Sequence, residues 1–230
     1  MTNTFILCHD QNIITELVNS KKYDNVGDYT FIFMGPGPVD QLSKDNVVIS
    51  RELPENIEQF RNCLQYCGWY SVYKNKLYGN TDRIRFIDYD VDIIKWDVNT
   101  LLDVKSYLNY DFSFYFDSGY GSCASRFCEN VLQKTGHTTQ ELLNNFFKNT
   151  EITKWFSTAD VLIKTNLFEQ FMEWVEPLFL KYKEEPCFGF HFERYLCVFC
   201  MSKNIPYQCV TGETEHQQLQ SHPYYSFTNR

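Results

Sequence analysis

The stretch IRFIDYDVDI, residues 84–93, decides how the rest of the sequence is interpreted. Its first half is an apolar run that predicts a buried β-strand, and Asp88, Asp90 and Asp92 follow at every second position. Alternate residues of a strand share a face, so the three carboxyl groups are expected to point the same way. Like charges at that spacing raise each other's pKa, and a bound divalent cation would compensate them. A solvated acidic loop at the end of a strand is the alternative interpretation.

Strand and helix patterns alternate along the chain around this stretch. Apolar runs predict strands at residues 4–8, 29–35, 46–50 and 83–90. Helical patterns occur at residues 10–23, 54–76, 96–108, 138–150, 164–184 and 190–204. A strand followed by a loop is expected at 111–122, and a closing strand at 205–210. This alternation predicts an α/β fold, a Rossmann-like domain with a central, mostly parallel sheet flanked by helices.

Composition limits the class of protein. The 230 residues contain no Pro/Ser/Gly-rich linker, so residues 1–230 are expected to form a single domain. The net charge of −8 argues against nucleic-acid binding, which needs clustered Lys and Arg. The N-terminal residues lack the pattern of a secretory signal, and no apolar run approaches the roughly 20 residues of a transmembrane helix. The sequence therefore predicts a cytoplasmic protein without a transmembrane segment.

Several short motifs do not match the signatures that they suggest. GPGP at residues 35–38 lacks the Lys and the Ser or Thr of a phosphate-binding loop, and its prolines remove N–H donors. GYGSCAS at 119–125 has the wrong order for a nucleophile elbow, and a loop is expected there. Cys197 and Cys200 form a single C-x-x-C without a second pair at zinc-site spacing, so packing in the core is expected.

Polar residues follow the predicted strands at one edge of the predicted sheet. Cys8, His9 and Asp10 come after the first strand, Gly35 comes after the second, and the acid cluster comes after the fourth. Open parallel sheets bind ligands at the carboxyl ends of their strands. This placement favours the metal interpretation of the acid cluster over the solvated loop.

Two segments resemble the nucleotide-sugar-dependent glycosyltransferases of the GT-A fold. They are WYSVYKN at 69–75 and DRIRFIDYDVDI at 82–93, and the likeness is closest to bacterial and large-DNA-virus (chlorella-virus-like) enzymes. FSTADVLIKTNLFEQFMEWVEPLF at 156–179 resembles the acceptor-side segment of such enzymes, and HFERYL at 191–196 resembles their acid-bearing helix. The resemblance follows the order of elements along the whole chain but is specific only within residues 66–93.

The resemblance implies a division of the chain and a metal site. Residues 1–95 correspond to the nucleotide-binding part and residues 96–230 to the acceptor-side part. The Asp-x-Asp pair of the family binds Mn²⁺ or Mg²⁺, which in turn holds the diphosphate of the nucleotide-sugar donor. This sequence offers two overlapping pairs, and Asp90 belongs to both of them.

Individual residues are assigned on this basis. Asp90 is the expected direct metal ligand, with Asp88 or Asp92 as its partner. His222, held before Pro223, is the expected third ligand, and an imidazole ligand would favour Mn²⁺ over Mg²⁺. The nucleotide is expected to contact Cys8, His9, Asp10, Gly35, Asp88, Tyr89 and Asp90.

The predicted activity is the transfer of a sugar from a nucleotide-diphosphate sugar to a glycan or protein-linked glycan acceptor. Glu193 is the expected general base of an inverting transfer, and Asp160 is the second candidate. Burial of Glu193 would raise its pKa toward the working pH, whereas an ion pair with Arg194 would oppose that shift. Two other classes fit an acid cluster: a metal-dependent phosphohydrolase or nuclease, and a non-catalytic protein of the same fold that binds sugars or nucleotides.

Overall fold

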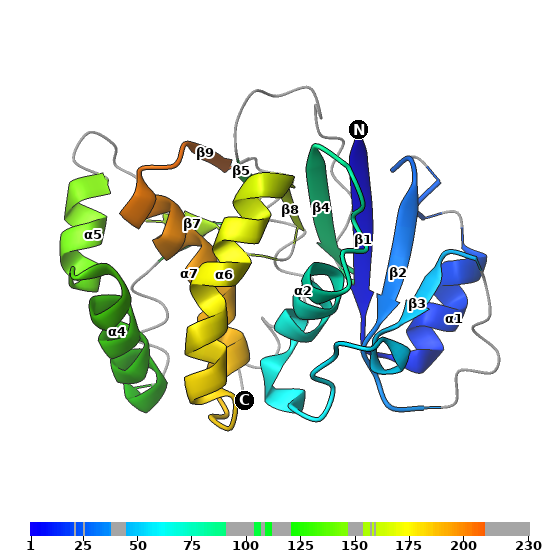
Figure 1. Cartoon of the computed structure of the whole chain (residues 1–230), viewed down its shortest axis with the longest axis horizontal. Coiled ribbons are helices and arrows are strands. Elements are labelled where there is room, and N and C mark those ends of the chain that lie inside the picture. The colour runs from blue at the N-terminus through cyan, green and yellow to red at the C-terminus, as the bar shows by residue number, and fades with distance from the viewer. Residues whose placement is uncertain are drawn as a thin grey trace.

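Seven of the described strands form one sheet in the computed structural model, in the order β3-β2-β1-β4-β8-β5-β9 (Figure 1). The structure describes residues 1–20, 22–24, 26–37, 45–90, 104–106, 109–111, 121–146, 154–156, 158 and 160–209. β1 (Thr2–Cys8) runs parallel to its two neighbours, β2 (Tyr29–Phe33) and β4 (Arg83–Asp88). β3 (Val47–Ile49) extends the sheet beyond β2 in the same direction.

β8 (Asp160–Lys164) reverses the strand direction within the sheet. It pairs antiparallel with β4 and with β5 (Val104–Ser106), and β9 (Tyr207–Cys209) pairs parallel with β5. A separate two-stranded antiparallel sheet consists of β6 (Asn109–Asp111) and β7 (Lys154–Phe156). Because β8 is antiparallel, its first residue, Asp160, lies opposite Ile87 near the end of β4. The reversal thus brings the second half of the chain to the carboxyl edge of the first.

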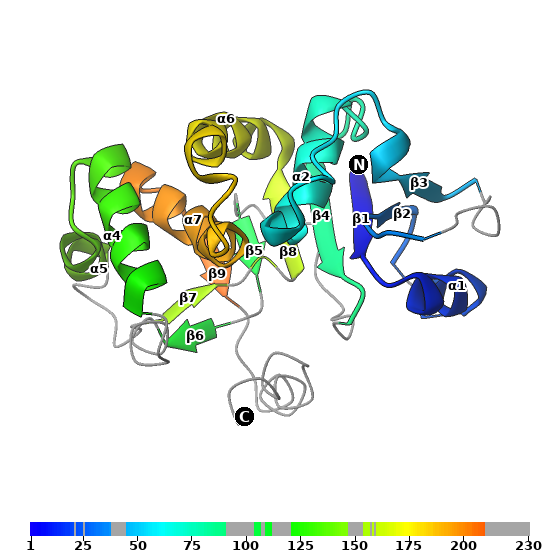
Figure 2. The same cartoon turned by 90° about the horizontal axis from the view of Figure 1, so that it is seen from below.

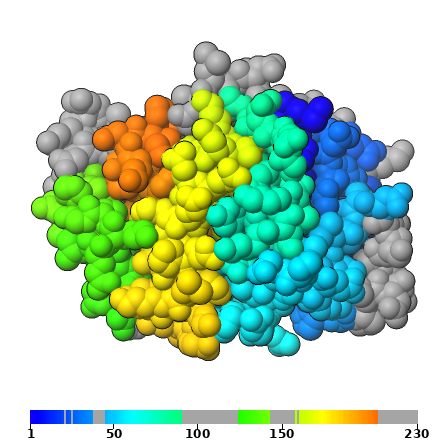
Figure 3. Space-filling view, viewed as in Figure 1, coloured from blue at the N-terminus to red at the C-terminus, as the bar shows by residue number. Residues whose placement is uncertain are grey.

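Helices cover both faces of the sheet. α1 (Gln11–Asn19) lies on one face, and α2 (Gln65–Lys74) and α6 (Thr165–Tyr182) lie side by side on the other (Figures 2 and 3). α7 (Phe188–Lys203) packs against α2 and α6, and α4 (Gly121–Thr135) and α5 (Thr139–Phe146) pack against α7. Two short 3-10 helices, η1 (Ser50–Glu52) and η2 (Arg61–Cys63), precede α2. In the described part of the chain, no helix combines the length and apolar character needed to cross a membrane.

The alternation of side chains along the strands divides the core into two layers. Phe5 and Leu7 of β1 belong to the large cluster under α2, α6 and α7, whereas Ile6 and Cys8 belong to the smaller cluster under α1. Both faces of β1 are therefore buried, which explains its continuous apolar run. In the larger cluster the ring of Trp69 is fully buried and stacks on Phe86 with ring centroids 4.0 Å apart. This packing fixes α2 against β4.

The predicted α/β class with a mostly parallel sheet is confirmed, with differences in individual elements. The helix expected at 54–76 begins only at Gln65, and residues 104–106, which were expected in a helix, form β5. β8 was not predicted, and α4 begins at Gly121, where a loop was expected. Cys197 and Cys200 are buried in α7, as the interpretation of the C-x-x-C as core packing required.

Candidate functional site

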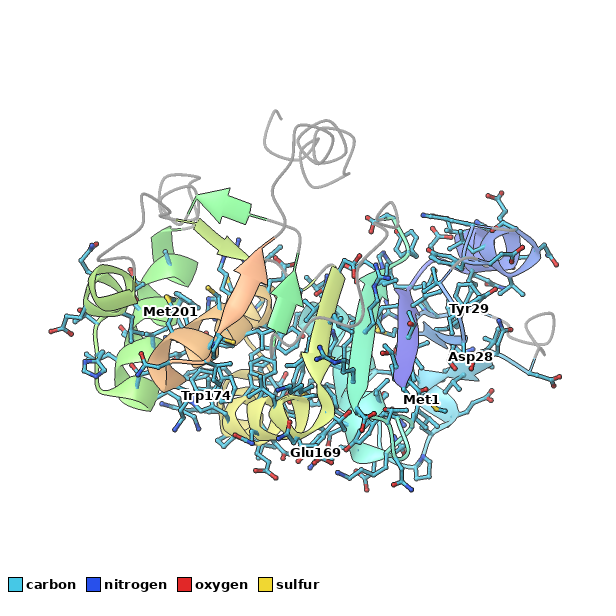
Figure 4. All side chains as sticks on the ribbon, turned by 90° about the horizontal axis from the view of Figure 1, so that it is seen from above. Met1, Asp28, Tyr29, Glu169, Trp174 and Met201 are labelled. Atoms are coloured by element: carbon cyan, nitrogen blue, oxygen red, sulfur yellow. The ribbon has the colours of Figure 1, made fainter. Side chains whose placement is uncertain are left out.

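A cavity of about 540 Å³ lies at the carboxyl ends of β1, β2 and β4. Figure 4 views the molecule from the opposite edge, where Met1 precedes β1 and Tyr29 begins β2. The cavity is lined by the turns after β1 and β2, by the end of β4, and by the segment that leads into α2. Polar and aromatic residues on these walls include His9, Arg51, Gln65, Asp88, Tyr89 and Asp90. Two members of the predicted acid cluster, Asp88 and Asp90, therefore border a cavity.

The turn after β1 contains three of the residues expected to contact a nucleotide. Asp10 caps α1, because its Oδ1 atom accepts hydrogen bonds from two backbone N–H groups of the first turn at 2.9 and 3.1 Å. The thiol of Cys8 donates to the backbone oxygen of Asp10 at 3.3 Å, and burial raises the pKa of Cys8 to about 12. His9 lines the cavity, and its ring meets the ring of Tyr89 edge-on at 5.2 Å.

Gly35 allows the turn after β2 to approach the turn after β1. A Cβ atom on Gly35 would lie 2.3 Å from the backbone oxygen of His9, so a larger residue does not fit there. The guanidinium group of Arg51 donates hydrogen bonds to the backbone oxygens of Gly35, at 2.5 Å, and of Gly37. Gly37 has a φ of +137°, a conformation that favours glycine. These contacts hold the turn in place as one wall of the cavity.

Asp88 ends β4 as a buried acid, with 7% of its surface exposed. The Nε2 group of Gln65 donates to its Oδ2 atom, and the hydroxyl of Thr158 donates to Oε1 of Gln65. Burial is the main reason that the pKa of Asp88 is raised well above its usual value. The charges of Asp90 and Glu193 raise this pKa further, whereas the hydrogen bond from Gln65 lowers it. A carboxyl group in these surroundings would be stabilised by a cation.

Backbone contacts fix the turn that carries Asp90. The N–H group of Tyr89 donates to the backbone oxygen of Leu7 at 3.0 Å. The backbone oxygen of Tyr89 accepts from Nζ of Lys22 at 2.9 Å and from the hydroxyl of Tyr23 at 3.2 Å. The chain therefore leaves β4 in a defined direction, and Asp90 follows at the cavity wall.

The predicted metal ligands are only partly within the described residues. Asp88 and Asp90 border the same cavity, and carboxylate oxygens are the ligands that hard divalent cations prefer. Asp92 and His222 lie outside the described residues. Within those residues, no group of three or more His, Cys, Asp or Glu side chains comes together as a metal ligand set. The described part of the chain thus offers two carboxyl groups for a cation.

The two predicted catalytic acids have different surroundings. Glu193 lies in α7, where burial raises its pKa and Arg194, whose Nη1 lies 3.3 Å from Oε2, opposes that rise. Its charge also acts on Asp88, so the two carboxyl groups are electrostatic neighbours. Asp160 is fully buried, and its Oδ1 and Oδ2 atoms accept hydrogen bonds from Nε and Nη2 of Arg85 at 2.9 and 2.6 Å. Both acids are paired with an arginine, but Asp160 is held by two shorter hydrogen bonds, whereas Glu193 has one contact of 3.3 Å.

Sequence reasoning missed three residues that shape the site. Arg51 lies just after the third strand, and a positively charged residue near a strand end is a signal in the sequence that could have identified it. Gln65 and Thr158 carry no such signal, because they are neutral residues 93 positions apart that meet through the reversal at β8. Their importance is visible only once the chain is folded.

No protein-family model matches the sequence, and no curated protein matches it at a significant level. A solved structure of the bifunctional glycosyltransferase WbbM, without ligand, matches the fold. It covers 91% of this chain with 9% sequence identity and a TM-score of 0.57. The chain spans 44% of the WbbM chain, which is less than half of its length. At this identity the likeness shows a shared fold.

Two further solved structures match less closely, each with a TM-score of 0.42. The galactosyltransferase LgtC, in complex with donor and acceptor sugar analogues, has 13% identity over 85% of this chain and 70% of its own. The core-mannan synthase CmsA/Ktr4 from Aspergillus fumigatus, in its Mn/GDP form, has 12% identity over 89% of this chain and 69% of its own.

Proposed function

We propose that this chain is a metal-dependent glycosyltransferase that moves a sugar from a nucleotide-diphosphate sugar to a glycan or protein-linked glycan acceptor. The observation that carries the proposal is the position of Asp88 and Asp90, which border a cavity of about 540 Å³ where β4 ends. In an open, mostly parallel sheet the carboxyl edge is where ligands bind. The fold shared with the glycosyltransferase WbbM supports the choice of reaction.

The residues at the end of β4 fit a hard divalent cation. Asp88 is buried, and the charges of other carboxyl groups act on it, so a cation would relieve both the repulsion and the cost of burying a carboxylate. We assign Asp90 as a direct ligand with Asp88 as its partner, and we propose Asp92 and His222 as further ligands on the basis of the sequence. When bound, Mn²⁺ or Mg²⁺ supplies a Lewis acid that neutralises the negative charge on the leaving diphosphate.

The nucleoside is proposed to lie against the turns after β1 and β2. His9 and Tyr89 present aromatic rings at the cavity, and such rings suit contact with a base. Gly35 leaves the backbone open to close approach, because it has no side chain. Cys8 and Asp10 support this wall, since the thiol bonds to the turn and the carboxylate caps α1.

Glu193 is proposed as the general base of an inverting transfer. A base must accept the proton of the acceptor hydroxyl as the glycosidic bond forms, and it works best when its pKa is close to the working pH. Burial moves the pKa of Glu193 in that direction. Asp160 is the second candidate, but a base at this position would have to give up its hydrogen bonds with Arg85.

Calorimetric titration with a panel of nucleotide sugars, with and without Mn²⁺, tests this function. We expect one nucleotide to bind in the presence of Mn²⁺ and the binding to be lost in Asp90→Asn, which keeps the shape of the side chain and removes its charge. Unchanged Mn²⁺-dependent binding in that variant would refute the assignment of Asp90.

The products of slow donor hydrolysis separate the classes of function. A glycosyltransferase breaks the bond between the sugar and the diphosphate, so it releases an intact nucleoside diphosphate. A metal-dependent phosphohydrolase breaks a phosphorus–oxygen bond and would release a nucleoside monophosphate. Binding without either product would indicate a sugar-binding or nucleotide-binding protein of the same fold.

A further inference from the structure

We propose that Gln65 is a positioning residue that orients the carboxylate of Asp88 for the metal ion. The inference rests on the proposed function, because it concerns the same metal site. Gln65 is the first residue of α2 and comes from a different part of the fold than β4. Its side chain is a neutral amide, and it is proposed to act through Asp88.

Both ends of the Gln65 amide are engaged. Its Nε2 group donates to Oδ2 of Asp88, and its Oε1 atom accepts from the hydroxyl of Thr158. An ionised carboxylate only accepts hydrogen bonds, so the NH₂ end of the amide must face Asp88 and the oxygen must face the hydroxyl. Gln65 and Thr158 are both buried, with 9% and 0% of their surfaces exposed. The hydrogen bonds therefore run in one direction, from Thr158 to Gln65 and from Gln65 to Asp88, and burial leaves them little freedom to rearrange.

The backbone before Gln65 has an unusual conformation that directs the residue to β4. Leu64 has φ +48° and ψ −128°, a combination that L-residues rarely adopt, and such outliers concentrate at functional sites. Leu64 is held against α7, since a Cβ atom on Gly189 would lie 2.6 Å from its Cγ atom. The Nδ2 group of Asn62 donates to the backbone oxygens of Lys183, at 3.0 Å, and Glu185, at 2.5 Å. These contacts tie the start of α2 to the connection between α6 and α7.

A carboxylate that binds a metal at this position needs a hydrogen-bond donor to hold it in the correct orientation. Asp88 lies near the carboxyl groups of Asp90, Glu193 and Asp160, which repel it. A hydrogen bond to Oδ2 limits its rotation and leaves the other oxygen for the cation. Residues that orient the ligands of a metal typically contribute 10- to 100-fold to metal affinity or activity. The bond from Gln65 is the contact in the described site that performs this task.

Mn²⁺ affinity in the presence of nucleoside diphosphate, followed by electron paramagnetic resonance and calorimetry, tests the proposal. We expect Gln65→Leu to bind Mn²⁺ roughly 10- to 100-fold more weakly than the wild-type protein. With a chelator present, its affinity for the nucleoside alone is expected to stay within twofold of the wild-type value, because the turns after β1 and β2, where the nucleoside is proposed to lie, are not altered. Gln170→Leu, which removes an exposed amide from α6, is the matched control and is expected to leave Mn²⁺ affinity unchanged.

Thr158 provides a second route to the same test if Gln65→Leu does not fold. Thr158→Val removes the anchor of the amide and is expected to weaken Mn²⁺ binding, whereas Thr158→Ser keeps the hydroxyl and is expected to lose less. The double variant Gln65→Leu/Thr158→Val is expected to bind Mn²⁺ no more weakly than Gln65→Leu, because the two residues act as one unit.

Two outcomes separate this inference from the function on which it rests. If Asp88→Asn loses Mn²⁺ binding while folded Gln65→Leu keeps it within twofold of wild type, the positioning role is overturned and the metal site stands. Normal Mn²⁺ affinity in Thr158→Val would overturn the role in the same way. If Asp88→Asn itself binds Mn²⁺ and nucleotide normally, the proposed function fails.

Discussion

Asp88 is a buried carboxyl group in acidic surroundings, and its pKa links the site to stability. Burial raises the pKa in the folded state, and the charges of Asp90 and Glu193 raise it further. A raised folded-state pKa means that the folded protein binds the proton more tightly than the unfolded chain. This contribution to stability is complete below the unfolded pKa of about 4, and it is lost as the pH rises through the folded value.

We therefore expect Asp88→Asn to stabilise the metal-free protein at pH 7 by about 1–3 kcal/mol, the cost of an incompletely compensated buried polar group. The Asn oxygen can still accept the hydrogen bond from Gln65. Urea denaturation between pH 4 and pH 8, with a chelator present, measures the effect. The stability of the wild-type protein should fall with rising pH, and that of the variant should fall less. Equal slopes would contradict this reading of Asp88, and Asp24→Asn, at an exposed position, serves as the control.

The substitution Glu193→Gln tests whether Glu193 is the general base. The amide cannot accept the acceptor proton, so we expect transfer to slow by roughly 10²- to 10⁴-fold while donor binding stays unchanged. Single-turnover transfer rates and calorimetric donor affinities measure the two effects separately. Glu184→Gln, at an exposed position before α7, is the matched control. A normal transfer rate in Glu193→Gln, or a product with retained anomeric configuration, would remove Glu193 from the mechanism.

What the sequence predicts at the residue scale depends on how local the pattern is. Asp88 and Asp90 were predicted at a strand end because their spacing is contained within a few residues of one strand. Gln65 meets Asp88 across 23 positions and Thr158 across 93, and no spacing rule connects such residues. Both belong to the site through tertiary contacts alone.

At the scale of elements, the differences from prediction have identifiable causes. Ile57 and Phe60 sit at helical spacing, but the chain turns at Leu64, whose positive φ is incompatible with a continuous helix across 54–76. α4 was missed because Gly121 and Ser122 at its start read as a loop, although the buried Phe127 lies farther along it. Long helices such as α6 and α7 were predicted, since several turns of apolar periodicity outweigh single exceptions.

β8 shows how one strand connects the halves of the chain. Asp160 of β8 and Arg85 of β4 form a buried ion pair, with Nη2 and Oδ2 2.6 Å apart. A buried charge that loses its partner is strongly destabilising, so we expect Asp160→Ala to cost about 3–5 kcal/mol of unfolding free energy. Chemical denaturation measures this loss.

The double variant Arg85→Met/Asp160→Leu, compared with Asp160→Ala, separates the loss of the ion pair from the burial of an unpaired charge. Replacing a buried pair by apolar residues of similar size is often neutral, so most of the lost stability should return. Glu129→Ala breaks an exposed ion pair with Arg126 and is expected to cost at most about 0.5 kcal/mol. A loss in Asp160→Ala as small as in this control would show that the pair does not hold β8 against β4.

At the scale of the whole molecule, the topology gathers acids from separate parts of the chain near Asp88, which borders the cavity at the end of β4. β4 supplies Asp88, the turn after it supplies Asp90, α7 supplies Glu193, and the reversed β8 supplies Asp160. The charges of the other three raise the pKa of Asp88, so an added negative charge is disfavoured beside Asp88. A diphosphate would be repelled by this edge unless a divalent cation were bound between them.

This charge arrangement predicts that metal and nucleotide stabilise the protein only together. Anything that binds the folded state at 100 times its Kd adds about 2.7 kcal/mol to the unfolding free energy, which is roughly 5–10 °C in Tm for a chain of this size. We expect a shift of this order with Mn²⁺ and a nucleoside diphosphate, and a much smaller shift with the diphosphate in a chelator. Because coupling is reciprocal, the nucleotide should raise Mn²⁺ affinity by the same factor by which Mn²⁺ raises nucleotide affinity. Thermal scans and reciprocal titrations measure both quantities, with a nucleoside that lacks phosphate as the control. Equal stabilisation by the diphosphate with and without metal would mean that the diphosphate does not bind close to the carboxyl groups at the end of β4.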